Sequence, residues 1–137
     1  MTPTAEFKLV PMRETAAPHT RPLGDTPEAI HDYWRQQVET SPAYCHTTEQ
    51  AVVFFLNTRR RITGHTFAAT GTLDTILIHP REIYHAAILA NAAAIVLAHN
   101  HPSGDPTPSE ADIKVTRDLI RAGQLLKIEM LDSIVIG

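Results

Sequence analysis

The chain has 137 residues, of which 43% are hydrophobic and 20% charged, and its formal net charge is −3. This composition is that of one globular domain with a single core, and the small negative charge excludes a general attraction to nucleic acid. Cys45 is the only cysteine, so no disulfide can form within the chain. We therefore expect a cytoplasmic protein in which Cys45 is a small, partly buried side chain. We expect no signal peptide, because the N-terminus lacks a charged segment followed by an apolar core of about 7–15 residues. We expect no membrane span, because no apolar run approaches ~18 residues.

The first 43 residues predict an extended arm followed by one helix. Residues 1–24 contain four of the ten prolines and show no sustained periodicity. We expect an arm there, with a short edge strand at Phe7–Val10. Residues 25–43 predict a helix, because Thr26 can cap free N–H groups and Pro27 suits the first helical position. The apolar side of this helix is expected to comprise Ile30, Tyr33, Trp34 and Val38.

Three strands are expected next. Residues 49–56, "EQAVVFFL", are almost continuously apolar and rich in β-formers, which is typical of a buried strand. The turn Asn57–Arg60 leads to a returning strand at Arg61–Ala69, and a third strand is predicted at Thr75–Ile78.

Helices and strands alternate in the rest of the chain. Pro80 starts a helix, residues 94–98 form a short buried strand, and Ser109 begins a second helix that Gly123 is expected to end. Residues 126–136 supply one or two last strands, so the whole predicts an α/β sandwich around a mixed sheet. The inner sides are expected to be Ile83, Ala87, Ile88 and Asn91 in the first of these helices, and Ile113, Thr116, Leu119 and Ile120 in the second.

Two histidines follow the buried strand at residues 94–98. Side chains two apart on a strand point to the same face, so His99 and His101 would project together from its carboxyl end. Strand ends in α/β sheets are where ligand crevices form. Two imidazoles and a carboxylate with an open fourth position make a catalytic zinc arrangement, so this pair predicts a metal site.

Asp112 is the candidate carboxylate, because the stiff turn at residues 102–106 could bring the next helix start over the strand end. Ser109 and Asp112 also have the spacing of a capping box, in which each side chain satisfies a backbone N–H of the other residue. The two interpretations are compatible, since a carboxylate has two oxygens.

The full stretch, "HPREIYHAAILANAAAIVLAHNHPSGDPTPSEAD", resembles the RadC (UPF0758) branch of the JAB/MPN domains. His-x-His, seven residues, Ser, two residues and Asp match the JAMM motif of the metallopeptidases in this group. The resemblance runs from about residue 44 to 137 and implies a JAB/MPN domain there, with a cytidine-deaminase-like three-layer sandwich. It implies Zn²⁺ held by His99, His101 and Asp112, with Ser109 steadying the oxyanion.

The resemblance also points to Glu49 as the acid that exchanges protons with water and the leaving group. The other interpretation of Glu49 is a polar residue at a strand end. Glu110 is expected to be turned away by its helix, and Glu82 with His85 has the E-x-x-H spacing of di-iron bundles but no second copy.

Three functions compete. The first is a zinc hydrolase acting on a peptide or isopeptide, and the second is a DNA-associated factor, supported by the family name and by Arg59–Arg61. The third is a non-catalytic scaffold, although the chain keeps all three ligands. We expect no helix-hairpin-helix region of the RadC type in the first 43 residues, which show neither its length nor its glycine-bearing hairpins. Asn57 and Ser133 stand where the RadC pattern usually has Asp and His. Substrate, oligomeric state and the role of the arm stay open.

Overall fold

The computed structural model describes residues 2–8, 10–12, 21–70 and 78–137. A four-stranded sheet has the order β2-β1-β3-β4, in which β1 is antiparallel to both β2 and β3, and β3 is parallel to β4. The strands are β1 (Gln50–Leu56), β2 (Ile62–Thr70), β3 (Ala94–Asn100) and β4 (Glu129–Ile136).

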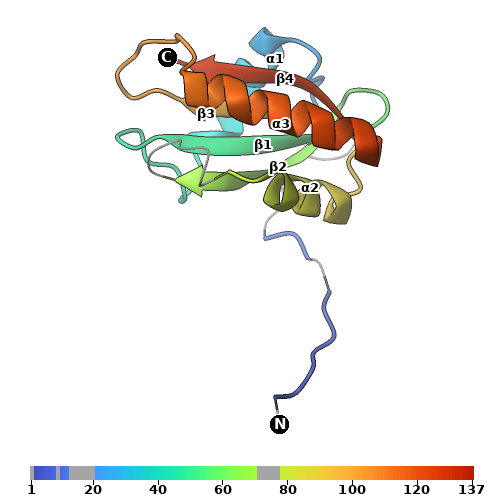
Figure 1. Cartoon of the computed structure of the whole chain (residues 1–137). Helices are drawn as coiled ribbons and strands as arrows, with labels where there is room; N and C mark the ends of the chain where they lie inside the picture. The colour runs from blue at the N-terminus through green and yellow to red at the C-terminus, as the bar shows by residue number, and fades with distance from the viewer. Residues whose placement is uncertain (1, 9, 13–20, 71–77) are drawn as a thin grey trace.

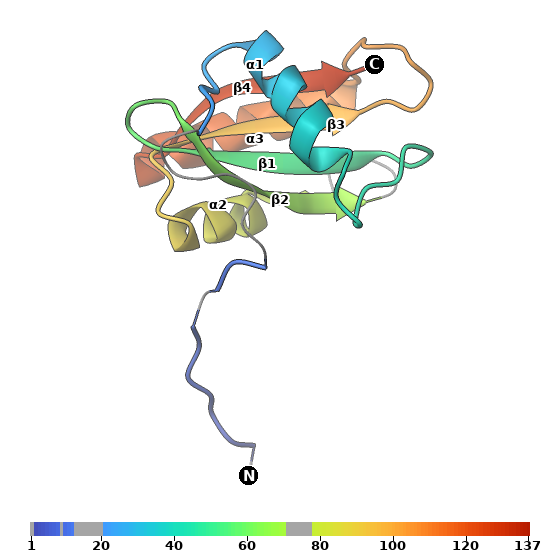
Figure 2. The same ribbon diagram turned by 180° about the vertical axis from the view of Figure 1, so that it is seen from behind.

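Helices cover both faces of the sheet. Helix α2 (Pro80–Leu89) and helix α3 (Glu110–Leu126) lie in front of the sheet in Figure 1. Helix α1 (Pro27–Tyr33) crosses the opposite face, which is turned toward the viewer in Figure 2. The predicted three-layer α/β sandwich around a mixed sheet is therefore confirmed. Within the described part of the chain, no helix is long and apolar enough to cross a membrane.

The two central strands divide the core into two clusters because their side chains alternate between faces. Every residue of β1 and β3 is buried. Val53 and Leu97 face α2 and α3, whereas Phe54 and Val96 face α1. Buried Trp34 belongs to η2 (Trp34–Val38), a π-helical continuation of α1 in which Glu39 N–H donates to the Trp34 carbonyl at 2.9 Å.

The arm and the strands differ from the sequence predictions in three places. Phe7, Lys8 and Val10 lie in no strand, and Phe7 is 91% exposed, because no strand among the described residues pairs with them. Residues 22–24 do pair, with Gly24 N–H donating to the Arg60 carbonyl at 2.8 Å. β3 continues to Asn100, two residues farther than predicted, and residues 75–77 of the third predicted strand lie outside the described residues.

Helix α3 buries only part of the predicted inner side: Leu119 is buried as predicted, whereas the two predicted isoleucines are not. The buried residues are Asp112, Val115, Leu119 and Gly123, whereas Ile113 and Ile120 remain 51% and 43% exposed. Gly123 does not end the helix, which continues to Leu126 and is closed by Lys127 in the left-handed region at φ 60°. A Cβ at Gly123 would collide with the Ile128 carbonyl and the Tyr84 hydroxyl, so Gly123 permits close packing inside the helix.

Three further expectations about single side chains are wrong. Ile88 is largely exposed, because Tyr84 takes the buried place beside Ile83 and Ala87. Asn91 lies beyond α2, in the left-handed region at φ 53°. Cys45 is exposed in the segment before β1.

Candidate metal centre

His99 and His101 lie at the carboxyl end of β3, on the face covered by α3. His99 is opposite Ala51 of β1 and is 2% exposed. His101 follows the strand, and its backbone N–H donates to the Ile136 carbonyl of β4 at 2.8 Å. The two Nε2 atoms are 3.0 Å apart, so strand alternation does bring both imidazoles to one point.

The loop between β3 and α3 fixes the ring of His101. Its Nδ1 lies 2.8 Å from the Asp105 carbonyl oxygen, and because a carbonyl only accepts, Nδ1 carries the proton. The Nε2 of neutral His101 therefore presents a lone pair, which is the form a metal ligand needs. Gly104, at φ 83°, allows the tight bend just before Asp105.

Asp112 comes from the first turn of α3 and takes part in a capping box. The Asp112 N–H donates to Ser109 Oγ at 3.1 Å, and the Ser109 N–H donates to Asp112 Oδ2 at 2.7 Å. Asp112 Oδ1 lies 3.3 Å from His99 Nε2, and Oδ2 lies 3.4 Å from His101 Nε2. Capping and convergence on the histidines thus occur together.

Burial and neighbouring ionisable groups shift the pKa values of His99 and Asp112. Burial lowers the pKa of His99, and His101 lowers it further, while Asp112 and Glu49 offset part of this effect. Burial of Asp112 opposes its ionisation, but the Ser109 backbone hydrogen bond and the two imidazoles outweigh it, so the pKa of Asp112 is lowered. Neutral imidazole and ionised carboxylate are the forms that bind a metal.

The donor set fits a zinc ion. Among the described residues, the group of side chains that could hold a cation offers two imidazole nitrogens and one carboxylate oxygen. Zinc–ligand distances of about 2.0–2.1 Å in a tetrahedron require donors about 3.3 Å apart. The two Nε2 atoms are 3.0 Å apart, and each lies near a different oxygen of Asp112, at 3.3 Å (His99 to Oδ1) and 3.4 Å (His101 to Oδ2). With one donor atom from each residue, the three donors lie within 4.8 Å of one another, so small side-chain adjustments would complete the tetrahedral arrangement.

Glu49 precedes β1 directly and is half-buried. Continuing the β1–β3 register from the Ala51–His99 pair by two residues places Glu49 opposite His101. Its carboxylate is close enough to His99 to raise the pKa of that imidazole. The structure therefore places Glu49 at the same end of the sheet as the histidine–aspartate group.

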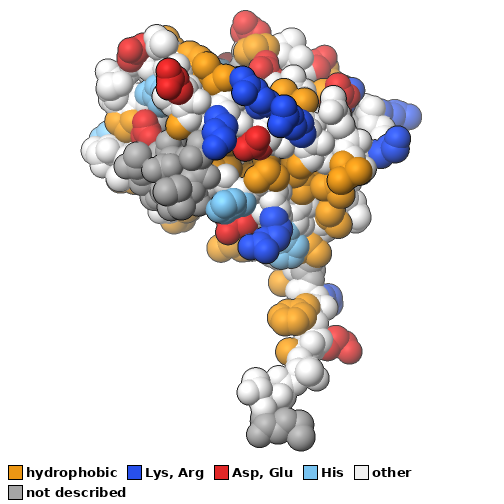
Figure 3. All heavy atoms as spheres, viewed as in Figure 1, with side chains coloured by type: hydrophobic (Ala, Val, Ile, Leu, Met, Phe, Trp, Pro, Cys, Tyr) orange, Lys and Arg blue, Asp and Glu red, His pale blue; other side chains and the backbone are white. Residues whose placement is uncertain are grey.

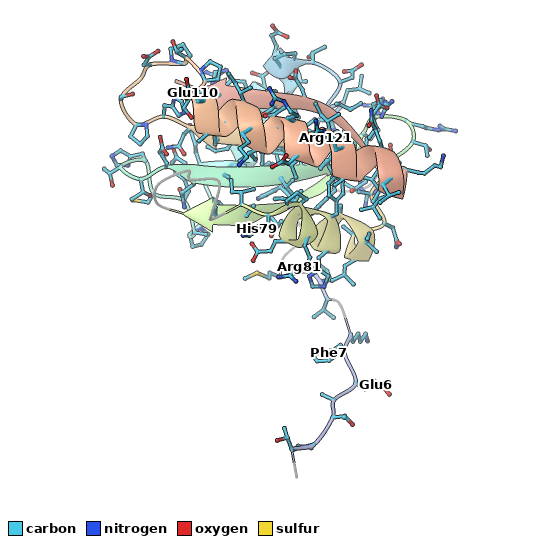
Figure 4. All side chains as sticks on the ribbon, in the orientation of Figure 1. Glu6, Phe7, His79, Arg81, Glu110 and Arg121 are labelled. Carbon is cyan, nitrogen blue, oxygen red and sulfur yellow. The ribbon has the colours of Figure 1, made fainter. Side chains whose placement is uncertain are left out.

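The competing residues lie elsewhere. Glu110 is exposed in the first turn of α3 and is labelled in Figure 4, and Glu82 and His85 are exposed on α2. None of them belongs to the group of donors described above.

Asn100 and Asp105 are the positioning residues that the sequence prediction did not include. Buried Asn100 points away from the imidazoles and bonds the backbone of Thr48 and Gln50, on either side of Glu49. The alternation of strand faces could have indicated that Asn100 supports the opposite side of the strand end. Asp105 acts through its backbone carbonyl, for which its residue type gives no signal.

The fold and this group define an α/β domain of the JAB class with a candidate metal centre at the end of its central strand. Comparison of the chain with known families finds a match of residues 24–137 to the RadC-like JAB domain. The chain belongs to this family, and the predicted RadC/UPF0758 membership is confirmed.

Curated relatives agree with this assignment. UPF0758 protein STH371 of Symbiobacterium thermophilum is 40% identical over 127 residues, which are 92% of this chain and 52% of the relative. A UPF0758 protein of Moorella thermoacetica is 54% identical over 82 residues, 60% of this chain and 36% of the relative. CT0611 of Chlorobaculum tepidum is 52% identical over 91 residues, 66% of this chain and 41% of that protein. The chain thus spans about half of these relatives' length, or less.

Proposed function

We propose that the protein is a zinc-dependent hydrolase of the metallopeptidase or isopeptidase type. The observation that supports this most directly is the convergence of His99, His101 and Asp112 within 4.8 Å of one another. They come from a strand, a loop and a helix. Burying such polar side chains costs free energy unless interactions with a partner compensate for their lost hydration. Membership of the JAB family is compatible with this function.

The three residues would hold the ion, each with one donor atom. When bound, zinc lowers the pKa of a coordinated water toward ~7 and polarises an acyl carbonyl. Asp105 keeps His101 in the required tautomer, and Ser109 N–H orients the Asp112 carboxylate through Oδ2, which leaves Oδ1 facing His99.

Glu49 and Ser109 would perform the proton transfer and the charge stabilisation. The Glu49 carboxylate, at the same end of the sheet as His99, would take a proton from the attacking water and deliver it to the leaving amine. Ser109 Oγ already accepts from the Asp112 N–H, so its own O–H proton remains to donate to the oxyanion.

Metal content and hydrolysis together test the proposal. Elemental analysis of the full chain at neutral pH should give one zinc per chain, and Asp112→Ala should lose it. Glu49→Gln should keep zinc and lose cleavage of a peptide library scored by mass spectrometry. A wild-type protein without stoichiometric zinc would contradict the proposal, as would a Glu49→Gln variant that cleaves at the wild-type rate.

A second candidate function, binding of nucleic acid, is favoured by one surface feature. Basic side chains gather over the outer side of α3 in Figure 3, and Arg121 is labelled there in Figure 4. Lys114, Arg117 and Arg121 are exposed at helical spacing, and among the described residues none of them forms an ion pair. The Arg59–Arg61 segment, in contrast, uses Arg60 to pair with Glu129 at 3.1 Å.

A further inference from the structure

Residues 43–49 form the segment that leads from the helical layer into β1. In Figures 1 and 2 this segment lies at the same end of the sheet as the loop between β3 and α3, which carries His101. The segment ends with Glu49, the proposed acid. The contacts that fix its backbone therefore bear on where the Glu49 carboxylate lies.

Gln50, the first residue of β1, has a buried amide in a strand that is otherwise apolar. It is 1% exposed. The strand period puts Gln50 on the face of Val52 and Phe54, which α1 covers. The same alternation assigns Glu49 to the opposite face, that of Ala51, which pairs with His99. Gln50 thus lies on the side of β1 that faces away from the candidate metal centre.

The amide of Gln50 closes a short loop of the chain. Its Oε1 accepts a hydrogen bond from the Cys45 N–H at 2.8 Å, and its Nε2 donates to the Ala43 carbonyl at 2.8 Å. Within this loop, the Thr48 N–H donates to the Cys45 carbonyl at 3.4 Å. Glu49 belongs to the stretch that these bonds close, and a closed loop has fewer backbone conformations than an open segment.

The two ends of the segment are held by neighbouring elements. The Gln50 N–H donates to Asn100 Oδ1 of β3 at 2.8 Å. The ring of Tyr44 packs edge-on against buried Trp34 of η2, with 6.0 Å between the ring centroids. With both ends held, the bonds of Gln50 fix the stretch between them.

The stability of the fold does not explain a glutamine at this position. Burying an amide costs free energy that its hydrogen bonds only offset, whereas a leucine of similar size has no such cost. Its partners Ala43 and Cys45 are exposed residues, so water can replace the Gln50 amide there. What the amide adds is a fixed conformation of residues 43–49.

We propose that Gln50 is a positioning residue, whose side-chain amide fixes residues 43–49 and so holds Glu49 in place for proton transfer. This inference rests on the proposed function, because it takes Glu49 to be the acid. It goes further by making the rate of hydrolysis depend on a side chain on the opposite face of β1. A misplacement of about 1 Å in a reacting group can cost about 10²-fold in rate.

Gln50→Leu tests the proposal, because leucine keeps the volume and removes both side-chain hydrogen bonds. In hydrogen exchange followed by NMR on the full chain, the Cys45 amide should exchange about tenfold faster or more, because it loses its acceptor. The denaturation midpoint and the zinc content should stay at the wild-type values. With a cleaved peptide, kcat should fall about tenfold or more while KM is unchanged.

Thr63→Val is the matched control, because it is nearly isosteric and removes the bond from Thr63 Oγ1 to the Phe55 carbonyl, 3.2 Å long, near the other end of β1. It should leave both the Cys45 exchange rate and kcat unchanged. The proposal is overturned if Gln50→Leu exchanges the Cys45 amide at the wild-type rate, or if its kcat equals that of Thr63→Val. Loss of zinc or of the fold in Gln50→Leu would also overturn it, because Gln50 would then be a structural residue.

Exchange and hydrolysis together separate this inference from the proposed function. A wild-type protein that cleaves no peptide would contradict the hydrolase, and faster Cys45 exchange in Gln50→Leu would still support the hold of Gln50 on the segment. Cleavage by the wild type with no change of exchange in Gln50→Leu would overturn the role of Gln50 and leave the hydrolase in place. Faster exchange together with a reduced kcat would support both.

Discussion

The side chain of Asn100 accepts a hydrogen bond from the backbone N–H of Gln50, with 2.8 Å between Oδ1 and N. Its Nδ2 also donates to the Thr48 carbonyl at 3.0 Å. Asn100 thus holds the peptide groups on both sides of Glu49, so the end of β3 positions the proposed acid as well as two proposed ligands.

Replacing Asn100 by Ala should therefore affect Glu49 more than the metal. The variant loses both hydrogen bonds and leaves the buried Gln50 N–H without its partner, which costs about 1–3 kcal/mol of unfolding free energy in urea titrations. Hydrolysis should slow, while elemental analysis still finds zinc, because Asn100 is not among the donors.

Asn57→Ala is the matched control for this prediction. Asn57 Oδ1 also accepts two backbone N–H groups, from Arg59 and Arg61 at 3.0 Å each, but at the opposite end of β1. Asn57→Ala should lose stability and keep the hydrolysis rate. Equal slowing in both variants would contradict a positioning role for Asn100.

The capping box predicts that zinc binding and helix stability can be separated. Ser109→Ala removes the acceptor of the Asp112 N–H and should cost about 0.5–2 kcal/mol of unfolding free energy while zinc stays bound. Asp112→Ala removes a zinc donor and the bond to Ser109 N–H, so it should lose both. Zinc content and denaturation measured on the two variants check this, and retention of one zinc by Asp112→Ala would contradict it.

Local patterns predict most helices and strands, because the sequence signals for these elements are strong. The apolar run of β1, the Thr26 cap of α1 and the Ser109 start of α3 all act within a few residues. The predicted inner side of α3 is right for Leu119 and wrong for Ile113 and Ile120, because the apolar residues of this helix face two surfaces. Val115 and Leu119 pack against the sheet, whereas Ile113 and Ile120 line a groove between α3 and β4, and only the placement of β4 distinguishes them.

The candidate site was predictable to the extent that it follows strand alternation and the resemblance to RadC. His99 and His101 share a face by the strand period, but the approach of Asp112 depends on a loop conformation set by Gly104 and the Asp105 carbonyl. Asn100 was missed because its two partners lie 50 and 52 residues away in sequence. Such contacts exist only once β1 and β3 have paired.

Gly123→Ala should destabilise the fold although alanine favours helices. A Cβ there would lie inside contact distance of the Ile128 carbonyl and the Tyr84 hydroxyl. Relieving that overlap should cost about 1–3 kcal/mol of unfolding free energy. Alanine gains only ~1 kcal/mol over glycine in helix propensity, so we expect the cost of the overlap to exceed the gain. Urea denaturation measures the difference. Adding Tyr84→Phe should give no rescue, because the backbone carbonyl remains in place, and a fully stable double variant would contradict this account.

Tyr84 predicts a loss of stability in alkaline solution. Its hydroxyl donates to the Leu119 carbonyl at 2.6 Å, and burial raises its pKa to about 12 from the model-compound value of 10.0. The unfolded chain releases this proton at a lower pH than the folded chain does. The contribution of Tyr84 to the free energy of unfolding is therefore fully present below pH 10 and is lost as the pH rises from 10 to 12. Denaturation midpoints should decline over that range in the wild type and decline less in Tyr84→Phe, and equal slopes in both would contradict the prediction.

The basic stripe of α3 predicts DNA binding that is sensitive to salt. If Lys114, Arg117 and Arg121 each neutralise one phosphate of a duplex, the logarithm of the binding constant should fall with the logarithm of salt concentration with a slope of about −2.7. Arg117→Ala should make this slope shallower by about 1, whereas Arg59→Ala, in the turn before β2, should leave it unchanged. Fluorescence anisotropy with a labelled duplex measures both slopes. No binding at about 50 mM salt would remove this function.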